Sequence, residues 1–525
     1  MLKASNRAKR IEPLNAAKQL CARLCRFRSI AEKEPLNRAA GALHMGDKYF
    51  ESEEFKTILQ KYEEAVAQGQ SPYLEPEELS DIAEYYEMLG NTIASADVLD
   101  YGISIFPDSA VLLALRARLA LVRDGDIAAA RRYVSLIEDT TAFEYYYIVA
   151  EIMITEDKVD DADSYLNEVL ETLYDDERED FIIDVTGIFA DYQQWEKAAR
   201  WLQLSTDVEA ADYKELRGRI AMNRGNFDES ERIFNELIDS DPYSTPYWNH
   251  LAMAQYMHHN IRDSIQSSEF SIAINPDDTE AILNKANGLF CLSNYEEAGQ
   301  FYQRYADLCP DDEVGELFHG ICCLNLEQID EGIKHLQRAE AIALRHRPTS
   351  SGQQLAPSNL PDIWQELAFA LSQKGMTDEA LTYIDKMSTE SGADPYEVLV
   401  MRGHLLMEGG RLEDGQACYM KAISDSAGAP QVFLRIAISI YDLGYYQHSY
   451  RMFQILRDCT DDSRTDGYAY EALCCYALGR YDEFKENVRL ACEKNPTEAQ
   501  MVLAEFFPPE LGPQDYYQWL LDNNP

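Results

Sequence analysis

The chain has 525 residues, of which 46% are hydrophobic and 26% are charged, a balance that predicts folded cores and excludes disorder over most of the length. Its formal net charge of −45 argues against nucleic acid and anionic membrane surfaces as partners, because like charges repel. No apolar run reaches the roughly 20 residues that a membrane helix needs. We therefore expect a cytoplasmic protein without membrane insertion.

The first 44 residues differ from the rest of the chain, since they carry 10 Lys plus Arg and 3 Glu, a net charge of +7. They lack the continuous apolar core of a secretory signal. Three interpretations of residues 1–44 stay open. They form a targeting address, a disordered arm that binds a partner, or an over-long gene prediction upstream of a true start at Met45.

From about residue 76 onward, one pattern returns at intervals close to 34 residues. Pro310, for example, stands 68 residues, or two steps of 34, after Pro242. Twelve frames follow in phase, beginning near residues 76, 111, 143, 179, 211, 245, 279, 313, 361, 396, 430 and 465. Each frame holds two apolar patterns of helical period separated by a turn. The sequence therefore predicts about twelve tandem helix-turn-helix repeats.

Glycine and proline mark the helix ends in many frames. Six glycines occupy the turn slot, where a left-handed residue commonly ends a helix: Gly90, Gly225, Gly375, Gly410, Gly444 and Gly479. Five prolines close their frames, because proline cannot continue a helix: Pro107, Pro242, Pro276, Pro310 and Pro496. The frames from 111, 143 and 179 lack most of these markers, so their registers are the least certain.

The repeat has small residues at positions 8 and 20, a large apolar or aromatic residue at 24 and proline at 32, and it resembles the tetratricopeptide repeat (TPR) family. Trp248 and Ala252 belong to a copy of that family's W-x-x-L-A opening. Small residues such as Gly320 and Ala298 let neighbouring helices approach closely. The resemblance covers roughly residues 76–498 and implies an all-α fold, a right-handed α-solenoid of stacked helix-turn-helix repeats.

The longest interval between frames contains residues 345–360, which are rich in Pro, Ser, Gly and Gln and have no apolar period. Such a composition predicts an exposed loop. The loop divides an N-terminal repeat block, 45–344, from a C-terminal block, 361–498. Whether it hinges the blocks or only interrupts a continuous stack stays open. We expect residues 499–525 to form capping helices over the last apolar face.

Catalytic and metal-binding motifs are scarce. The chain has no P-loop, no dinucleotide-binding glycine pattern, no H-E-x-x-H and no G-x-S-x-G. His258–His259 and Cys322–Cys323 are adjacent pairs, whose members point about 100° apart on a helix and cannot readily chelate one metal. The sequence therefore predicts a protein that is not an enzyme, has no cofactor or metal site, and keeps its cysteines reduced and mostly buried.

In the TPR family the first helix of each repeat lines the concave side of the solenoid, which by resemblance assigns positions 2, 5, 9 and 12 of each frame to a groove. From residue 245 onward these positions form a mostly apolar and aromatic stripe: Asn249, Met253, Tyr256, Leu283, Asn287, Phe290, Leu317, Ile321, Leu324, Phe369, His404, Met407, Ile438, Tyr441, Leu473 and Tyr476. Such a stripe is typical of a groove that holds a peptide segment of a protein partner. The acidic surface favours a basic segment. The alternative is that several of these residues pack inside the solenoid.

The family's carboxylate clamp, which captures chaperone tails, implies Lys, Asn and Arg at five slots of three successive frames. For the frames from 245, 279 and 313 these slots hold Asn249, Met253, Asn284, Val314 and Phe318, and only Asn284 fits. Chaperone-tail binding is therefore not expected. The leading hypothesis is a non-catalytic scaffold for protein–protein interaction. A regulatory subunit that wraps a catalytic partner, and a cryptic hydrolase or transferase without a recognisable motif, stay as alternatives.

Overall fold

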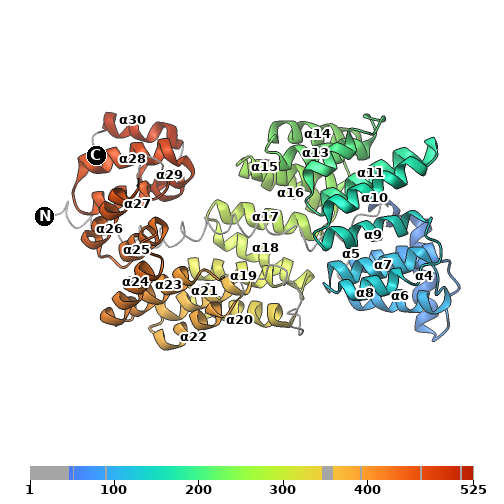
Figure 1. The fold of residues 1–525 in the computed structure, drawn as a ribbon, viewed down its shortest axis with the longest axis horizontal. Coiled ribbons are helices and arrows are strands. Elements are labelled where there is room, and N and C mark those ends of the chain that lie inside the picture. The colour runs from blue at the N-terminus through green and yellow to red at the C-terminus, as the bar shows by residue number, and fades with distance from the viewer. Residues whose placement is uncertain are drawn as a thin grey trace. The chain divides into compact units, whose positions relative to one another are not determined.

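The computed structural model describes residues 47–50, 52–88, 91–123, 125–345, 359–390, 393–460, 464–508 and 511–523. The regular secondary structure of these residues is entirely helical (Figure 1). The basic head, Gly90 and most of the predicted loop 345–360 lie outside the described residues.

Twelve consecutive helix pairs follow one another along the described residues. The first helices are α5 (Pro76–Met88), α7 (Ala110–Val122), α9 (Phe143–Thr155), α11 (Asp175–Asp191), α13 (Ala211–Asn223), α15 (Thr245–Met257), α17 (Thr279–Cys291), α19 (Glu313–Asn325), α21 (Leu360–Gln373), α23 (Pro395–Glu408), α25 (Pro430–Asp442) and α27 (Tyr468–Ala477). The second helices are α6 (Thr92–Ile105), α8 (Ile127–Val134), α10 (Val159–Thr172), α12 (Trp195–Leu202), α14 (Phe227–Ser240), α16 (Ile261–Ile274), α18 (Tyr295–Leu308), α20 (Ile329–Arg345), α22 (Thr377–Ser388), α24 (Leu412–Asp425), α26 (Tyr446–Cys459) and α28 (Tyr481–Lys494). Each first helix packs on its own second helix, and many also pack on the first helix of the next pair.

The predicted all-α solenoid of helix-turn-helix repeats is therefore confirmed. The predicted frames begin within one residue of a first helix, except that α11 begins before position 179 and α27 begins after position 465. The five predicted prolines each stand two residues after the last residue of a second helix. Proline thus marks the end of these five second helices.

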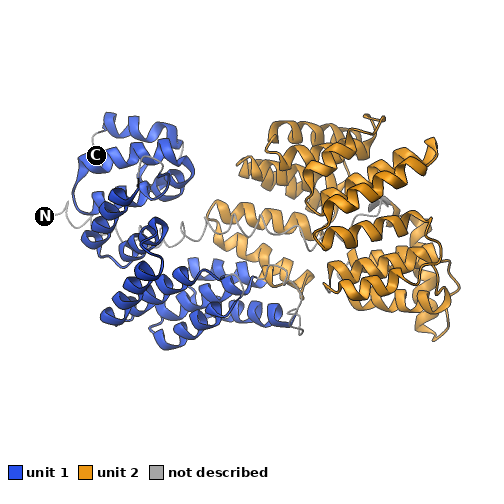
Figure 2. Ribbon diagram, viewed as in Figure 1, with its two compact units in different colours: residues 1–31, 316–345, 358–525 blue, residues 32–315, 346–357 orange. Residues whose placement is uncertain are grey.

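The pairs belong to two compact units (Figure 2). Unit 2 contains the described residues up to Gly315, and unit 1 contains the described residues from Glu316 onward. The change of unit therefore falls inside α19. The predicted division at residues 345–360 stays a prediction, because most of that loop lies outside the described residues.

Shorter helices flank the pairs. In unit 2, α3 (Asp47–Phe50) and α4 (Glu53–Ala67) precede α5, and the fully buried Phe55 packs into the same core as Leu79. In unit 1, α29 (Pro496–Leu503), a short 3-10 turn and α30 (Pro513–Asn523) follow α28. The rings of Phe507 and Tyr516 stack there with centroids 3.9 Å apart. α29 and α30 lie at the predicted capping helices and pack on α28.

The turn between the two helices of a pair contains a residue in the left-handed backbone region in most of the repeats. Gly225 and Gly375 adopt positive φ angles of 78° and 76° at the predicted turn slot. Residues other than glycine do the same in other repeats: Asp157, Gln193, His259, Ser293 and Glu327. A left-handed conformation costs a residue with a Cβ atom about 1–2 kcal/mol. The turn geometry is therefore imposed by the pairing of the helices and not by glycine alone.

Close approach of helices requires glycine at specific contacts. A Cβ atom on Gly403 of α23 would lie 2.5 Å from the ring of Tyr419 on α24. A Cβ atom on Gly320 of α19 would lie 2.9 Å from Leu336 on α20, as the predicted role of Gly320 requires. These separations are shorter than van der Waals contact, so a larger side chain would push the helices apart.

Two second helices are unusually short. α8 and α12 have 8 residues each, whereas α22 has 12 and α20 has 17. Both short helices lie in frames that lack most of the glycine and proline markers. The pairs from α7 to α12 are thus the least regular part of the described array.

Candidate functional site

The structure distributes the predicted groove residues between the protein interior and the surface. Ten of them are buried: Asn249, Leu283, Phe290, Leu317, Ile321, Leu324, His404, Met407, Tyr441 and Leu473. Six remain partly exposed: Met253, Tyr256, Asn287, Phe369, Ile438 and Tyr476. Contact with a peptide through the predicted stripe therefore depends mainly on the six partly exposed side chains.

The buried polar members of the stripe have internal partners. Asn249 Nδ2 donates a hydrogen bond of 2.9 Å to Asp278 Oδ2, on the segment that leads into α17. His404 Nδ1 lies 2.9 Å from the hydroxyl of Ser439 on α25, and burial lowers the pKa of His404. These bonds join neighbouring repeats, so both side chains help to hold the array together.

A recurring charge occupies the ninth position of the first helices in unit 2. Glu84, Arg118 and Glu151 lie on α5, α7 and α9, at steps of 34 and 33 residues. Arg219 lies on α13, 68 residues after Glu151, at the corresponding position two frames later. The sign of the charge alternates along this row. We name these four residues the charged row.

The centre of the charged row is a buried ion pair. Arg118 and Glu151 are 6% and 2% exposed. Arg118 Nε donates to both carboxylate oxygens of Glu151 at 3.0 Å, and its Nη2 lies 2.5 Å from Oε1. The hydroxyl of Tyr192 donates a further bond of 3.2 Å to Oε2. Burial alone would lower the pKa of Arg118, but Glu151 raises it, so Arg118 keeps its positive charge.

The end of the charged row nearer to α15 is a second ion pair. Arg219 Nη2 donates to Asp191 Oδ1 at 2.6 Å, and the two side chains are 20% and 12% exposed. Burial raises the pKa of Asp191, and the charge of Arg219 partly offsets that rise. This pair links the end of α11 to α13, in the same way that Arg118 links α7 to α9.

The other end of the charged row is Glu84, a partly buried residue of α5. Burial raises the pKa of its carboxyl group to about 7, although the charge of Arg118 acts in the opposite direction. Within the described part of the chain, no hydrogen-bond donor or cation is paired with this carboxylate. Glu84 is therefore a desolvated acid whose ionised form lacks a partner among the described residues.

Sequence reasoning missed the charged row, although the signal was present. The groove positions were read only from residue 245 onward, where the ninth position holds uncharged residues such as Met253 and Asn287. Steps of 34 residues from Met253 toward the N-terminus reach Arg219 and Glu151, and further steps fall one residue before Arg118 and Glu84.

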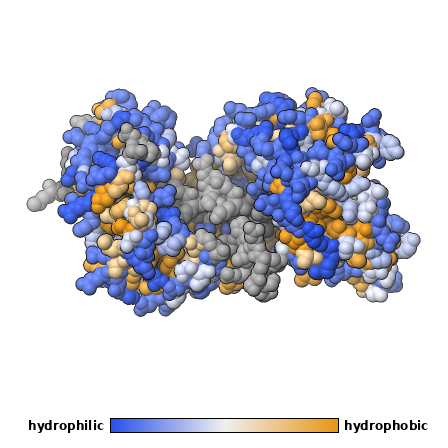
Figure 3. Space-filling model, viewed as in Figure 1, coloured by the Kyte–Doolittle hydropathy of each residue, from blue (hydrophilic) through white to orange (hydrophobic). Residues whose placement is uncertain are grey.

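The described surface is mainly polar. Figure 3 shows a largely hydrophilic face on which hydrophobic residues gather in separate clusters on each unit. Of the helices that the structure describes, none combines the length and the hydropathy that a bilayer crossing requires.

Comparison with known proteins supports the repeat assignment. Residues 396–424, which contain most of α23 and α24, match the tetratricopeptide repeat family model. No curated protein matches the chain.

Solved structures with a similar arrangement include MamA from Desulfovibrio magneticus RS-1, with 16% identity, a TM-score of 0.30, and 34% of this chain and 97% of that chain covered. They also include pilF of Pseudomonas aeruginosa, with 16% identity, a TM-score of 0.34 and coverages of 43% and 95%. A tetratricopeptide repeat protein from Parabacteroides merdae has 15% identity, a TM-score of 0.36 and coverages of 50% and 98%. These low TM-scores carry no argument about function.

TPR proteins are usually non-catalytic and generally mediate interactions between proteins. Twelve helix pairs of one form follow each other along the described residues, and the pair formed by α23 and α24 matches the family model. Residues 396–424 therefore form a tetratricopeptide repeat, and the other described helix pairs have the same helix-turn-helix form.

Proposed function

We propose that the protein is a non-catalytic interaction scaffold that binds a basic segment of a protein partner at Glu84, which lies at one end of the charged row of unit 2. The observation that carries this proposal is the unpaired carboxylate of Glu84. A Lys or Arg side chain of a partner would supply the missing opposite charge. Hydrogen bonds to charged groups contribute about 1.5–3 kcal/mol.

The surroundings of Glu84 also favour a cation. Asp81, one turn earlier on α5, accepts a hydrogen bond of 2.8 Å from the hydroxyl of Tyr49, and burial raises its pKa. Glu63 on α4 accepts a bond of 3.1 Å from the hydroxyl of Tyr86. The nearby positive charge of Arg118 is neutralised by Glu151. The field around Glu84 is therefore negative, in keeping with the net charge of −45.

Partly exposed apolar side chains supply a second kind of contact in unit 2. Met253 and Tyr256 of α15 are both partly exposed at predicted groove positions. The Tyr256 hydroxyl lies 3.1 Å from the sulfur of Cys291 on α17. Flexible methionine and tyrosine side chains adapt to different apolar residues of a peptide. The proposed partner segment therefore combines basic residues with apolar residues.

Binding of a fluorescent Lys/Arg-rich peptide to the full chain tests this proposal. Glu84→Gln removes the charge and keeps the shape, and we expect it to weaken binding by about tenfold, which corresponds to roughly 1.4 kcal/mol. Glu168→Gln is the matched control, because Glu168 is exposed on the second helix α10. Fluorescence anisotropy at two salt concentrations measures both affinities, and the wild-type affinity should fall as salt rises. Equal affinities of the wild type and the two variants would refute the role of Glu84.

A further inference from the structure

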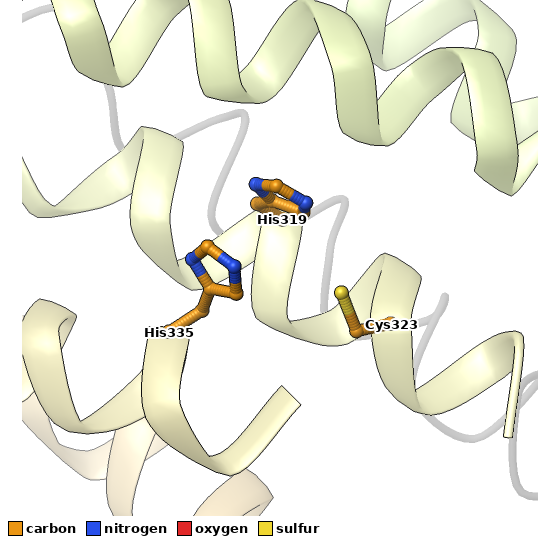
Figure 4. A group of neighbouring side chains, drawn as sticks. All are labelled: His319, Cys323 and His335. Carbon is orange, nitrogen blue, oxygen red and sulfur yellow. The ribbon is translucent and has the colours of Figure 1, made fainter. Parts of the chain in front are cut away.

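Three side chains with metal-binding atoms meet between α19 and α20 in unit 1 (Figure 4). His319 and Cys323 lie one helical turn apart on α19, and His335 approaches them from α20. One ring nitrogen of each histidine and the sulfur of Cys323 all lie within 4.8 Å of one another. Two imidazoles and one thiol therefore converge on a common volume.

The separations are close to those of a zinc site. Zinc binds histidine nitrogen at about 2.0–2.1 Å and cysteine sulfur at about 2.3 Å in a tetrahedral arrangement, which places ligand atoms roughly 3.3–3.8 Å apart. The two histidine rings stack with centroids 4.0 Å apart and an interplanar angle of 27°. His319 is partly exposed, and Cys323 and His335 are buried. Bringing ligand atoms that lie within 4.8 Å of one another to zinc-site separations requires displacements on the order of 1 Å.

A buried carboxylate orients one of the histidines. Glu316 Oε2 lies 2.6 Å from Nδ1 of His335, and the two side chains are 12% and 11% exposed. Arg338 Nη1 lies 3.5 Å from the other oxygen of Glu316. When Nδ1 donates its hydrogen to a carboxylate, Nε2 presents a lone pair to a metal. Metal-bound histidines in proteins usually have such a carboxylate or carbonyl partner.

The donor set selects the class of metal. A thiolate with two imidazoles suits zinc or monovalent copper, whereas magnesium and calcium prefer oxygen ligands. Cys323 and His335 are 5% and 8% exposed, so water competes little for these two ligands. Three protein ligands leave one tetrahedral position for a solvent molecule.

We propose that unit 1 binds one Zn²⁺ ion through His319, Cys323 and Nε2 of His335, and that Glu316 positions His335. The Cys323 thiol releases its proton to solvent as the sulfur–zinc bond forms. The ion would fasten α19 to α20. No metal site was predicted from the sequence, because Cys322 and Cys323 were considered only as an adjacent pair. The four-residue step from His319 to Cys323 places both on one helix face, and that spacing was the overlooked signal.

Cobalt substitution of the full-length protein tests the site. Metal is removed with a chelator, Co²⁺ is added, and absorption spectra are recorded before and after Zn²⁺ is supplied. We expect a sulfur-to-cobalt charge-transfer band that saturates at one ion per chain and disappears when Zn²⁺ displaces Co²⁺. The band reports on thiolate coordination, so weak binding of cations to the acidic surface does not contribute to it.

Cys323→Ala should abolish the band. Cys322→Ala is the matched control, because Cys322 is the adjacent residue of the same helix, is 1% exposed and lies outside the group; this variant should keep the band. Glu316→Gln should keep the band and weaken zinc binding by about 10–100-fold, the usual effect of losing such a carboxylate partner.

Circular dichroism checks that each variant stays helical, and if Cys323→Ala unfolds, His335→Gln and Glu316→Gln carry the test. The absence of a sulfur-to-cobalt band in the wild type would overturn the proposal. A band that survives in Cys323→Ala would also overturn it. The same holds if the cobalt affinity measured from the band is unchanged in both His335→Gln and Glu316→Gln.

Discussion

The repeats from α7 to α12 and the repeats from α23 to α26 fill the contacts between their helices in different ways. The second group packs regular helices closely, and its glycines permit that approach, as at Gly403 against Tyr419. The first group contains the two short second helices and a buried ion pair between Arg118 and Glu151. In its helix α11, a Cβ atom on Gly187 would meet nothing within 4 Å. The same helix-turn-helix form thus tolerates tight apolar packing in one group of repeats and looser packing, bridged by long charged side chains, in the other.

The largest expected effect on stability comes from breaking the ion pair between Arg118 and Glu151. Glu151→Ala leaves Arg118 buried without its bidentate partner, and we expect a loss of about 3–5 kcal/mol of stability. Urea unfolding followed by circular dichroism measures the change. The double variant Arg118→Met with Glu151→Leu removes both charges and keeps the volume, so it should be much closer to the wild type. If the two variants were equally destabilised, lost packing and not the unpaired charge would be the cause.

Glycine substitutions compare the packing of the two regions directly. Gly403→Ala should cost about 1–3 kcal/mol, because the new methyl group overlaps Tyr419. Gly187→Ala, also in a first helix, should instead gain up to about 1 kcal/mol, because alanine favours the helix and the space is open. Thermal unfolding of both variants gives the two signs, and a loss at both positions would contradict the proposed difference in packing.

Much of the fold was predictable from the sequence, because the residues that define each repeat act within a single helical hairpin. Small residues, turn glycines and closing prolines act within one hairpin, so a 34-residue step read from Pro242 and Pro310 located most of the helices. The burial of Phe290 and Tyr441 was not predictable, because the same apolar residue type suits a groove and a core. The pairing of Arg118 with Glu151 depends on how successive repeats stack, and charged residues are rarely assigned to a core from sequence.

Substitutions at the turn between the two helices of a pair should have a smaller effect on stability, and they compare the same two kinds of repeat. Gln193, between α11 and α12, has a φ angle of 58°, whereas the corresponding slot between α21 and α22 is Gly375. Gln193→Gly should stabilise the protein by roughly 1 kcal/mol, because glycine adopts this conformation without steric cost. Gly375→Ala should destabilise it by a similar amount. Differential scanning calorimetry of the two variants checks that the shifts have opposite signs.

The smallest expected effect concerns pH and Glu84. The pKa of its carboxyl group is about 7 in the folded protein and near 4.5 when unfolded, so the folded state binds this proton more tightly. The contribution of this tighter proton binding to the free energy of unfolding is fully present below pH 4.5 and is lost as the pH rises through about 7. After solvent screening we expect on the order of 1 kcal/mol or less. Melting temperatures at pH 5 and pH 8 should differ less in Glu84→Gln than in the wild type, and an unchanged difference would contradict the raised pKa.

The ion pair between Arg118 and Glu151 also has a consequence for how the array unfolds. Repeat proteins can fray one repeat at a time, because each repeat contacts only its neighbours. Detaching α9 while α7 stays docked would leave a lone charge in a poorly hydrated place, so such a half-open state is penalised. The ion pair thereby increases the cooperativity between adjacent hairpins. Amide hydrogens of α7 and α9 should exchange with solvent in a single opening event, with similar protection factors. In the double variant Arg118→Met with Glu151→Leu, the protection factors of the two helices should differ from each other.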